Sequence, residues 1–297
     1  MSTSVEDPQS FGSPTTGMTR SYRSARSLFG IVMTILAGAC LVIALIPLFL
    51  VMFYVLVQGI SRVDLNLFTK LPPPPGLKGG GVGNAIIGTL MVVGLGTLIS
   101  LPFGVLAAVY LSEFSTGKIS RWVRFATNVL AGVPSIIAGI FAYGIIVVTM
   151  GHFSAVAGGI ALSVLMLPTI IRTTDEALQI VPQDIRWASV GVGASNYQTV
   201  LKVVLPAAIP AIITGVTLAI ARAAGETAPL IFTALNSPFW PRGIWNPTPT
   251  LAVLIYNFSG VPFKPLQELA WASSLILVCL ILLTSILARW ATRKSIY

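Results

Sequence analysis

The sequence predicts an all-α membrane protein with six transmembrane helices. Of its 297 residues, 55% are hydrophobic and only 9% are charged, whereas roughly a quarter of the residues of an ordinary soluble domain carry a charge. The mean hydropathy is +0.88. A soluble fold of this composition would lack a polar surface to meet water, so we expect the chain to lie in a bilayer.

Each predicted span meets the requirement of about 20 mostly apolar residues for a helix that crosses a bilayer. The six spans cover residues 28–57, 85–111, 125–149, 153–171, 206–235 and 269–291. Residues 1–27, which are rich in Ser, Thr and Pro and show no apolar periodicity, predict a disordered cytoplasmic tail. The transmembrane domain is then 28–297, with a core at 84–290.

Lysine and arginine are distributed unequally between the two sides, and six spans place both termini on one side. Twelve of them lie on that side: Arg20, Arg23, Arg26, Lys118, Arg121, Arg124, Arg172, Arg186, Lys202, Arg289, Arg293 and Lys294. Five lie on the other: Arg62, Lys70, Lys78, Arg242 and Lys264. Because positively charged loops stay in the cytoplasm, we expect both termini there.

The residues that commonly build metal and nucleotide sites are scarce. Cys40 and Cys279 lie far apart in apolar runs, and His152 is the only histidine, so neither a disulfide framework nor a metal cluster is predicted. The glycine–lysine pattern of a phosphate-binding P-loop is missing from the sequence. We therefore expect this chain to bind no cofactor and to catalyse no reaction itself.

The inner connection at residues 173–204 is much longer than the other inner connections and is patterned. Apolar residues recur at helical spacing on both sides of Gly193, which predicts two short amphipathic helices joined by a turn. Ser195 or Asn196 is placed to cap the second helix, and Pro206 to open the fifth span. Such short helices need a surface for their apolar side, which either the membrane or a cytoplasmic partner could supply.

This connection resembles the cytoplasmic loop of the permeases of ABC importers. The family motif is Glu-Ala-Ala, a glycine four residues later, nine further residues and then Ile-x-Leu-Pro. Here Trp187-Ala188-Ser189 stands at the first position, Gly193 at the glycine, and Val203-Val204-Leu205-Pro206 at the end. The resemblance implies the type I, MetI-like architecture. It also implies that the 173–204 loop contacts an ATPase through Ala188, Gly193, Ala194, Leu205 and Pro206. Trp187 replaces the glutamate of the motif, which puts any contact of that glutamate in doubt.

A second set of segments resembles the PstA family of phosphate permeases over roughly residues 72–290. The segments are Gly83 to Thr89, Pro168 to Thr174, and Ala219 to Leu230, which includes Gly225-Glu226-Thr227-Ala228-Pro229. The resemblance implies a high-affinity phosphate importer in the bacterial inner membrane. Its expected partners are a second permease of PstC type, an ATPase dimer of PstB type that binds ATP and Mg²⁺, and an extracytoplasmic phosphate-binding protein of PstS type.

Arg222 and Glu226 fall inside the predicted fifth span, four residues apart and so on one helix face. A charge at mid-membrane costs about 2.5–3.5 kcal/mol or more, and it therefore pairs or faces a polar cavity. The two residues could form a structural ion pair, or they could line a path for an anion. The family resemblance implies that both, together with Arg172, influence the passage of phosphate. Arg172 taken alone also fits an ordinary positive-inside anchor.

Two other functions remain open at this point. One is an ABC permease for another oxyanion, such as sulfate or molybdate, which the Gly225 to Pro229 segment disfavours. The other is a secondary transporter or channel. That class predicts internal inverted repeats or several intramembrane carboxylates, whereas Glu226 is the single intramembrane carboxylate found. A secondary transporter or channel would also leave the 173–204 loop unexplained.

Overall fold

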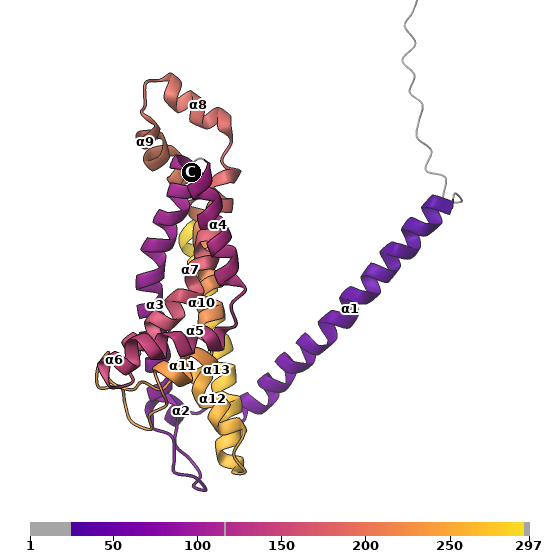
Figure 1. Cartoon of the computed structure of the whole chain (residues 1–297). Coiled ribbons are helices and arrows are strands. Elements are labelled where there is room, and N and C mark those ends of the chain that lie inside the picture. Colours follow the sequence, from indigo (N-terminus) through magenta and orange to yellow (C-terminus); the bar gives the residue numbers. More distant parts are fainter. Residues whose placement is uncertain (1–24, 116, 294–297) are drawn as a thin grey trace, which may run out of the picture. The chain divides into compact units, whose positions relative to one another are not determined.

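The structure is a computed structural model that describes residues 25–115 and 117–293. Within these residues the chain is helical and contains no β-strand (Figure 1). Two units are distinguished, one up to Phe53 and one from Tyr54 onward, and each is described by itself. Most of the predicted tail, residues 1–24, lies outside the described residues, and so do Lys294 and the residues after it.

The first unit contributes most of α1 (Ala25–Ile60), a candidate membrane span with a proline, Pro47, inside it. Apolar residues occur on every side of this helix, which is the composition of a membrane span. In the second unit, the last two turns of α1 lie against α13. There the rings of Tyr54 and Trp271 meet edge to face, with their centroids 4.9 Å apart.

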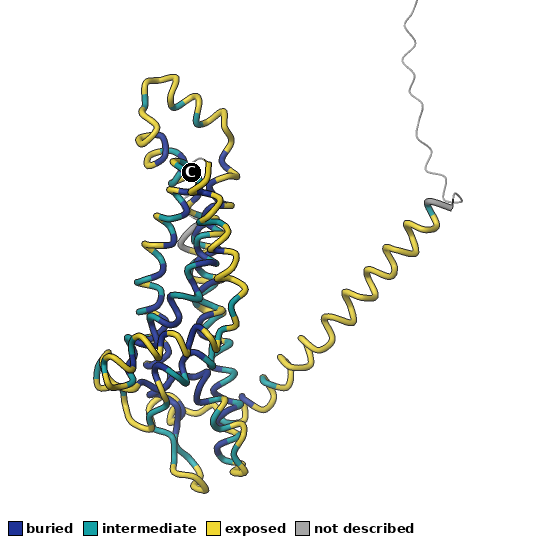
Figure 2. The backbone as a smooth tube through the Cα atoms, in the orientation of Figure 1, coloured by how far each residue is buried: buried dark blue, intermediate teal, exposed yellow. Residues whose placement is uncertain are grey.

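The core of the second unit is built from three long helices: α3 (Gly83–Val109), α7 (Ala155–Ile180) and α10 (Leu205–Ala224). The dark blue, buried positions in Figure 2 follow these helices. α3 continues into a π-helical turn, η1 (Tyr110–Phe114). A Cβ atom on Gly159 of α7 would lie 2.7 Å from the Cβ of Leu95 on α3. The small residue therefore lets the two helices approach closely, as is common in membranes.

α3 and α7 run in the same direction, since Gly96 meets Gly159 and, further along both helices, Gly104 meets Ile170. The chain between them must therefore return from one side of the bundle to the other. It does so through α4 (Lys118–Ala131), α5 (Ser135–Ala142), η2 (Tyr143–Val147) and α6 (Val148–Met150). With α1, this gives the six predicted crossings in the described residues.

The third crossing, predicted as an apolar span at 125–149, is not one continuous helix and begins earlier, at Lys118. α4 and the α5–α6 segment meet at an angle of 100°, at Gly132-Val133-Pro134. Proline disfavours helical geometry at the residue before it and lacks the N–H that would continue the ladder of hydrogen bonds. The chain therefore breaks at Pro134 (Figure 1).

The fifth span also ends earlier than predicted, at Ala224 rather than near residue 235. A break follows at Gly225, and then a short helix, α11 (Ala228–Thr233), which begins with proline in its first turn. A Cβ atom on Gly139 of α5 would lie 2.5 Å from the Cα of Pro229, so α11 packs tightly on the bent third crossing. The chain then passes through α12 (Leu251–Ser259) into the last span, α13 (Lys264–Arg293).

The connection between α1 and α3 holds a short helix, α2 (Leu65–Thr69). Asp64 caps it: its Oδ1 accepts a 2.9 Å hydrogen bond from the Leu67 amide, and its Oδ2 accepts one of 3.0 Å from the Asn66 side chain. The Asn66 hydrogen bond has the largest effect and lowers the pKa of Asp64 below its ordinary value, against a smaller opposing effect of desolvation; the hydrogen bond from the Leu67 amide lowers this pKa further. Leu67 is buried in a second apolar cluster with Leu254 and Leu269, which joins α2 to α12 and α13.

The close approach of α3 and α7 predicts that alanine is tolerated less well at Gly159 than at Gly94. Replacing Gly159 with alanine should destabilise the assembled protein by about 1–3 kcal/mol, because the new methyl group overlaps Leu95. Gly94→Ala on α3 is the matched control, since a Cβ there meets nothing within 4 Å. Thermal unfolding of the detergent-solubilised protein measures both. Equal melting temperatures for the two variants would contradict the packing described here.

Candidate functional site

A continuous exposed stripe runs along α10 at spacings of three and four residues. Its members are Ala207, Ala211, Thr214, Leu218 and Arg222. A similar stripe on α7 holds Arg172, Glu176 and Ile180. The two stripes adjoin, because a Cβ on Gly215 of α10 would lie 2.2 Å from the Thr173 hydroxyl of α7. We call this surface the α7–α10 face.

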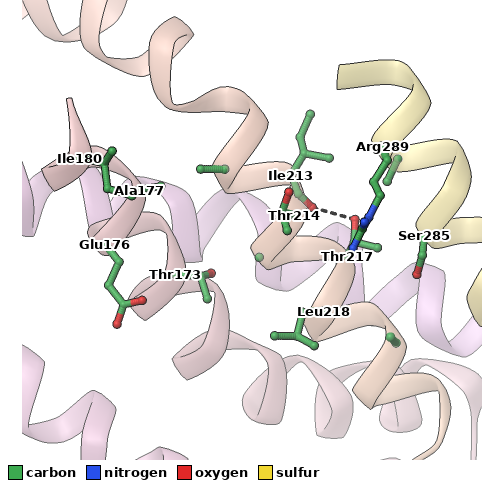
Figure 3. A pocket seen from close by; sticks show the side chains of 14 residues that line it. Thr173, Glu176, Ala177, Ile180, Ile213, Thr214, Thr217, Leu218, Ser285 and Arg289 are labelled. Carbon is green, nitrogen blue, oxygen red and sulfur yellow. Dashed lines mark hydrogen bonds between the residues drawn. The ribbon is translucent and has the colours of Figure 1, made fainter. Parts of the chain in front are cut away.

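The α7–α10 face opens into a cavity of about 390 Å³ between α7, α10 and α13. Figure 3 shows the side chains around it, which include Thr173, Glu176, Thr214, Thr217, Ser285 and Arg289. The hydroxyl of Thr217 donates a 2.7 Å hydrogen bond to the Ile213 carbonyl, and its oxygen keeps lone pairs that can accept a bond. The lining is mainly apolar, but these hydroxyl groups and the Glu176 and Arg289 side chains offer polar atoms between apolar helices, where they favour contact with water or a solute.

Arg172 and Glu176 form an ion pair across one turn of α7, with 3.0 Å between Nε and Oε1. The two side chains are 69% and 60% exposed. They therefore lie at the surface of the α7–α10 face, where a partner or a solute can reach them.

Arg222 and Glu226 form a looser ion pair, with 3.8 Å between Nε and Oε1. They do not share one helix: Arg222 lies in the last turn of α10, and Glu226 follows the break. The amide of Gly225 donates to the Arg222 carbonyl at 3.1 Å, and the chain turns there. Arg222 is 61% exposed, while Glu226 is only 17% exposed. The cation at the carboxyl end of α10 is also favoured by the helix dipole.

The structure brings Arg222 and Glu226 together and keeps Arg172 apart from them. Thr173 is level with Gly215, and Arg222 lies seven residues beyond Gly215, which corresponds to about 10 Å along the helix axis. The helix after the break, α11, lies at the same depth as Val92 of α3, because Leu230 of α11 and Val92 both lie beside Gly158 of α7. Val92 is nine residues, or about 13 Å, inside the start of α3. The Arg222 pair therefore lies within the thickness of the helix bundle.

The long inner connection forms the predicted pair of short helices. α8 (Gln183–Gly191) and α9 (Asn196–Thr199) are joined at Gly193, whose φ is +92°, a value that favours glycine. Ser195, rather than Asn196, caps the second helix: its hydroxyl accepts from the Gln198 amide, and its own amide donates to the Gln198 side chain. This prediction of two helices and a turn is confirmed.

The ends of this connection differ from the prediction in two respects. α7 continues to Ile180, because the first residue that interrupts its helical pattern is Pro182. α9 passes through a π-helical turn, η3 (Val200–Val204), directly into α10. Pro206 therefore lies inside a continuous helix rather than at its start. The wider turn of η3 ends two residues before Pro206, which cannot donate a backbone hydrogen bond.

The predicted coupling residues lie along this hairpin of α8 and α9 and at the start of α10. Ala188 is exposed on α8, Gly193 forms the turn, and Ala194 follows it half-buried. Leu205 packs at the edge of the main core, and Pro206 is exposed. The hairpin lies at the end of the second unit opposite α2 and α12 (Figure 1).

Two buried carboxylates were not predicted as site residues. Asp175 on α7 pairs with Arg124 on α4, and Glu113 on η1 pairs with Arg186 on α8. From the sequence, both arginines were interpreted only as cytoplasmic positive charges. The partners are 51 and 73 residues apart along the chain, so no local spacing could have indicated either pair.

The sequence matches, over residues 100–297, the family described as binding-protein-dependent transport system inner membrane component. Solved structures with the same fold include an alginate ABC transporter, with a TM-score of 0.64 and 13% identity over 93% of this chain and 98% of that one. A methionine ABC transporter in an inward-facing conformation has a TM-score of 0.58 and 23% identity over 73% and 95%. The chain therefore belongs to the inner membrane permeases of ABC importers.

Curated relatives narrow this class. The phosphate transport system permease protein PstA of Yersinia pestis is 40% identical over 86% of this chain and 87% of its own length. That of Haemophilus influenzae is 41% identical over 84% and 88%. A probable PstA of Methanocaldococcus jannaschii is 31% identical over 93% and 98%. The chain is a member of the PstA family, as its Gly225 to Pro229 segment predicted.

The turn at Gly193 predicts a local loss of order in one of two matched variants. Gly193→Ala should destabilise the hairpin by about 1–2 kcal/mol, because a Cβ is strained at positive φ. Gly191→Ala adds a methyl group in open space on α8 and should not destabilise the helix. Hydrogen exchange of the α8 and α9 amides distinguishes the variants. Equal exchange in both would contradict the strained turn.

Proposed function

We propose that this chain is the permease subunit of an ATP-driven phosphate importer and forms one side of its translocation path. The observation that carries this proposal is the α7–α10 face, on which Arg172, Glu176 and Arg222 lie between membrane-spanning helices, with both arginines largely exposed. Its charged residues lie in segments of a chain that is about 40% identical to permeases named for phosphate transport.

Arg222 is the residue we assign to phosphate. A guanidinium group presents several N–H donors in a planar fork that suits two oxygens of a phosphate. The 3.8 Å separation from Glu226 is longer than a hydrogen bond, so donors remain available to an anion. Glu226 partly neutralises the arginine between transport events. Arg172, about 10 Å further toward the hairpin, offers a second cation along the same face.

A second permease, of PstC type, supplies the other wall of the path. An arginine that is 61% exposed is costly against lipid at this depth and requires a polar neighbour or water. A second permease packed over the α7–α10 face would enclose Arg172, Arg222 and the adjoining cavity. The path would then lie between the two permeases.

The hairpin is the proposed contact with an ATPase dimer of PstB type. The exposed side chains of α8 include Ile185, Trp187 and Val190, which form an apolar surface suited to a groove in a partner. Trp187 takes the place of the glutamate in the family motif. The ATPases bind ATP and Mg²⁺, and the change in their separation moves the hairpin together with α7 and α10.

The hairpin and both termini face the cytoplasm, in agreement with the unequal distribution of lysine and arginine. The connection that holds α2, and the segment between α11 and α12, face outward toward a binding protein of PstS type. Sulfate and molybdate are less favoured, because the Arg222 to Pro229 segment has the PstA pattern. A secondary transporter leaves the hairpin unexplained.

Reconstituted transport tests the proposal. In proteoliposomes that contain the complete assembly, phosphate-loaded binding protein should stimulate ATP hydrolysis and phosphate uptake. Arg222→Gln should reduce both at least about tenfold, which corresponds to 1.4 kcal/mol. Arg121→Gln, which removes an exposed arginine of α4, is the matched control. Stimulation by sulfate but not phosphate would refute the substrate, and full activity of Arg222→Gln would refute the assigned path.

Cysteine labelling tests the orientation. Asp184→Cys on α8 and Lys78→Cys in the outer connection are placed singly in a chain whose Cys40 and Cys279 are replaced by serine. In intact cells, a membrane-impermeant thiol reagent should label only the cysteine at 78. After permeabilisation, the reagent should also label the cysteine at 184. Labelling of position 184 in intact cells would reverse the orientation.

A further inference from the structure

α8 is attached to the rest of the chain through its polar residues. Among its nine residues, all described by the structure, none is buried, and only Arg186 and Ser189 are half-buried. They lie three residues apart, so they share one face of the helix. The apolar residues Ile185, Trp187 and Val190 are exposed. The hairpin in Figure 2 is correspondingly yellow over most of its length.

Arg186 binds two other elements at once. Its Nη1 atom forms an ion pair with Oε2 of Glu113, on the π-helical end of α3. Its Nη2 atom donates a 2.7 Å hydrogen bond to the Leu178 carbonyl, near the end of α7. The side chains of Arg186 and Glu113 are only 14% and 7% exposed. A pair this well shielded is screened little by salt, unlike an ordinary surface ion pair.

Glu113 is held on its other side as well. The Ser112 hydroxyl donates to its Oε1 atom at 3.2 Å, so both carboxylate oxygens have partners. The same turn, η1, is also contacted by Arg124, whose Nη2 atom lies 3.5 Å from the Leu111 carbonyl. Arg124 in turn pairs with Asp175 on α7. The end of α3 is therefore fixed between two arginines, one of which belongs to the hairpin.

Ser189 connects α8 to a different span. Its hydroxyl lies 2.9 Å from the Thr199 hydroxyl at the end of α9, and α9 continues through η3 into α10. α8 thus has one polar attachment to α3 and α7, at Arg186, and another to α10, at Ser189. A displacement of α8 acts on α3 through the first attachment and on α10 through the second.

We propose that Arg186 and Glu113 are positioning residues that transmit the motion of α8 to α3. The inference rests on the proposed contact between the hairpin and an ATPase. No side chain of α8 is buried, so the shielded ion pair is the contact that connects α8 firmly to the end of α3. Without it, the ATPases can still move α8, but α3 no longer follows. ATP is then hydrolysed without a matching movement of phosphate.

The test is the number of ATP molecules hydrolysed for each phosphate imported, measured in proteoliposomes with the complete assembly and loaded binding protein. Arg186→Glu and Glu113→Arg should each raise this ratio roughly tenfold, within the usual range of a coupling between sites. The double variant, with the two charges exchanged, should restore it toward the wild-type value. Arg121→Glu makes the same change of charge at an exposed residue of α4 and should leave the ratio unchanged.

Each outcome supports or overturns the proposal. Restoration of the ratio in the exchanged variant supports it, because a loss of stability alone changes the amount of assembly and not the ratio. A wild-type ratio in assembled single variants overturns it. If the single variants do not assemble, Arg186→Lys decides, since lysine keeps the charge but not the fork that binds both Glu113 and Leu178. A raised ratio in that variant supports the proposal, and an unchanged ratio overturns it. Failure of phosphate to stimulate the wild-type assembly would instead refute the proposed function.

Discussion

The close parallel packing of α3 on α7 determines the arrangement of the second unit. Small residues such as Gly96 and Gly159 bring the two backbones together, which in a bilayer replaces the hydrophobic driving force available in water. Two helices that run in the same direction require the chain between them to cross back. The bent crossing made of α4 and α5 is therefore a consequence of this packing, and α11 packs on α5 in turn.

Few residues of the chain are charged, and their ion pairs are of two kinds, which differ in the exposure of the side chains. Glu113 and Asp175 are buried and bind arginines from distant parts of the chain, so these pairs hold elements together. Arg172 and Arg222 are largely exposed and pair only within a turn. An arginine held loosely by a neighbouring carboxylate can exchange that partner for an anion. This difference in exposure is the physical basis for assigning structural roles to the first pairs and a transport role to the second.

Several local features could be predicted from the sequence because short-range chemistry specifies them. Positive φ at Gly193 and the capping box at Ser195 depend on residues within a few positions of each other. The breaks at Pro134 and Gly225 also have local signals, a proline and a glycine, but no local signal gives the direction that the chain takes after each break. An apolar run of sufficient length appears as one straight span whether or not it bends, since lipid accepts apolar residues at every angle. The corrected end of α10 changes Arg222 from a mid-helix residue into one beside a break.

The sequence by itself determined the membrane setting, the number of crossings, the hairpin after the fourth span and the PstA family. Each of these follows from composition, from periodicity or from a contiguous motif. Only the tertiary structure decided which charges are shielded and which are exposed. The sequence did not distinguish Arg124 and Arg186 from the other cytoplasmic arginines, and it placed Arg222 within a continuous span. Glu113, 73 residues away, shields Arg186, and Asp175, 51 residues away, binds Arg124. A break in the backbone leaves Arg222 exposed on the α7–α10 face. Burial depends on which helices meet, and that is fixed by packing over the whole bundle.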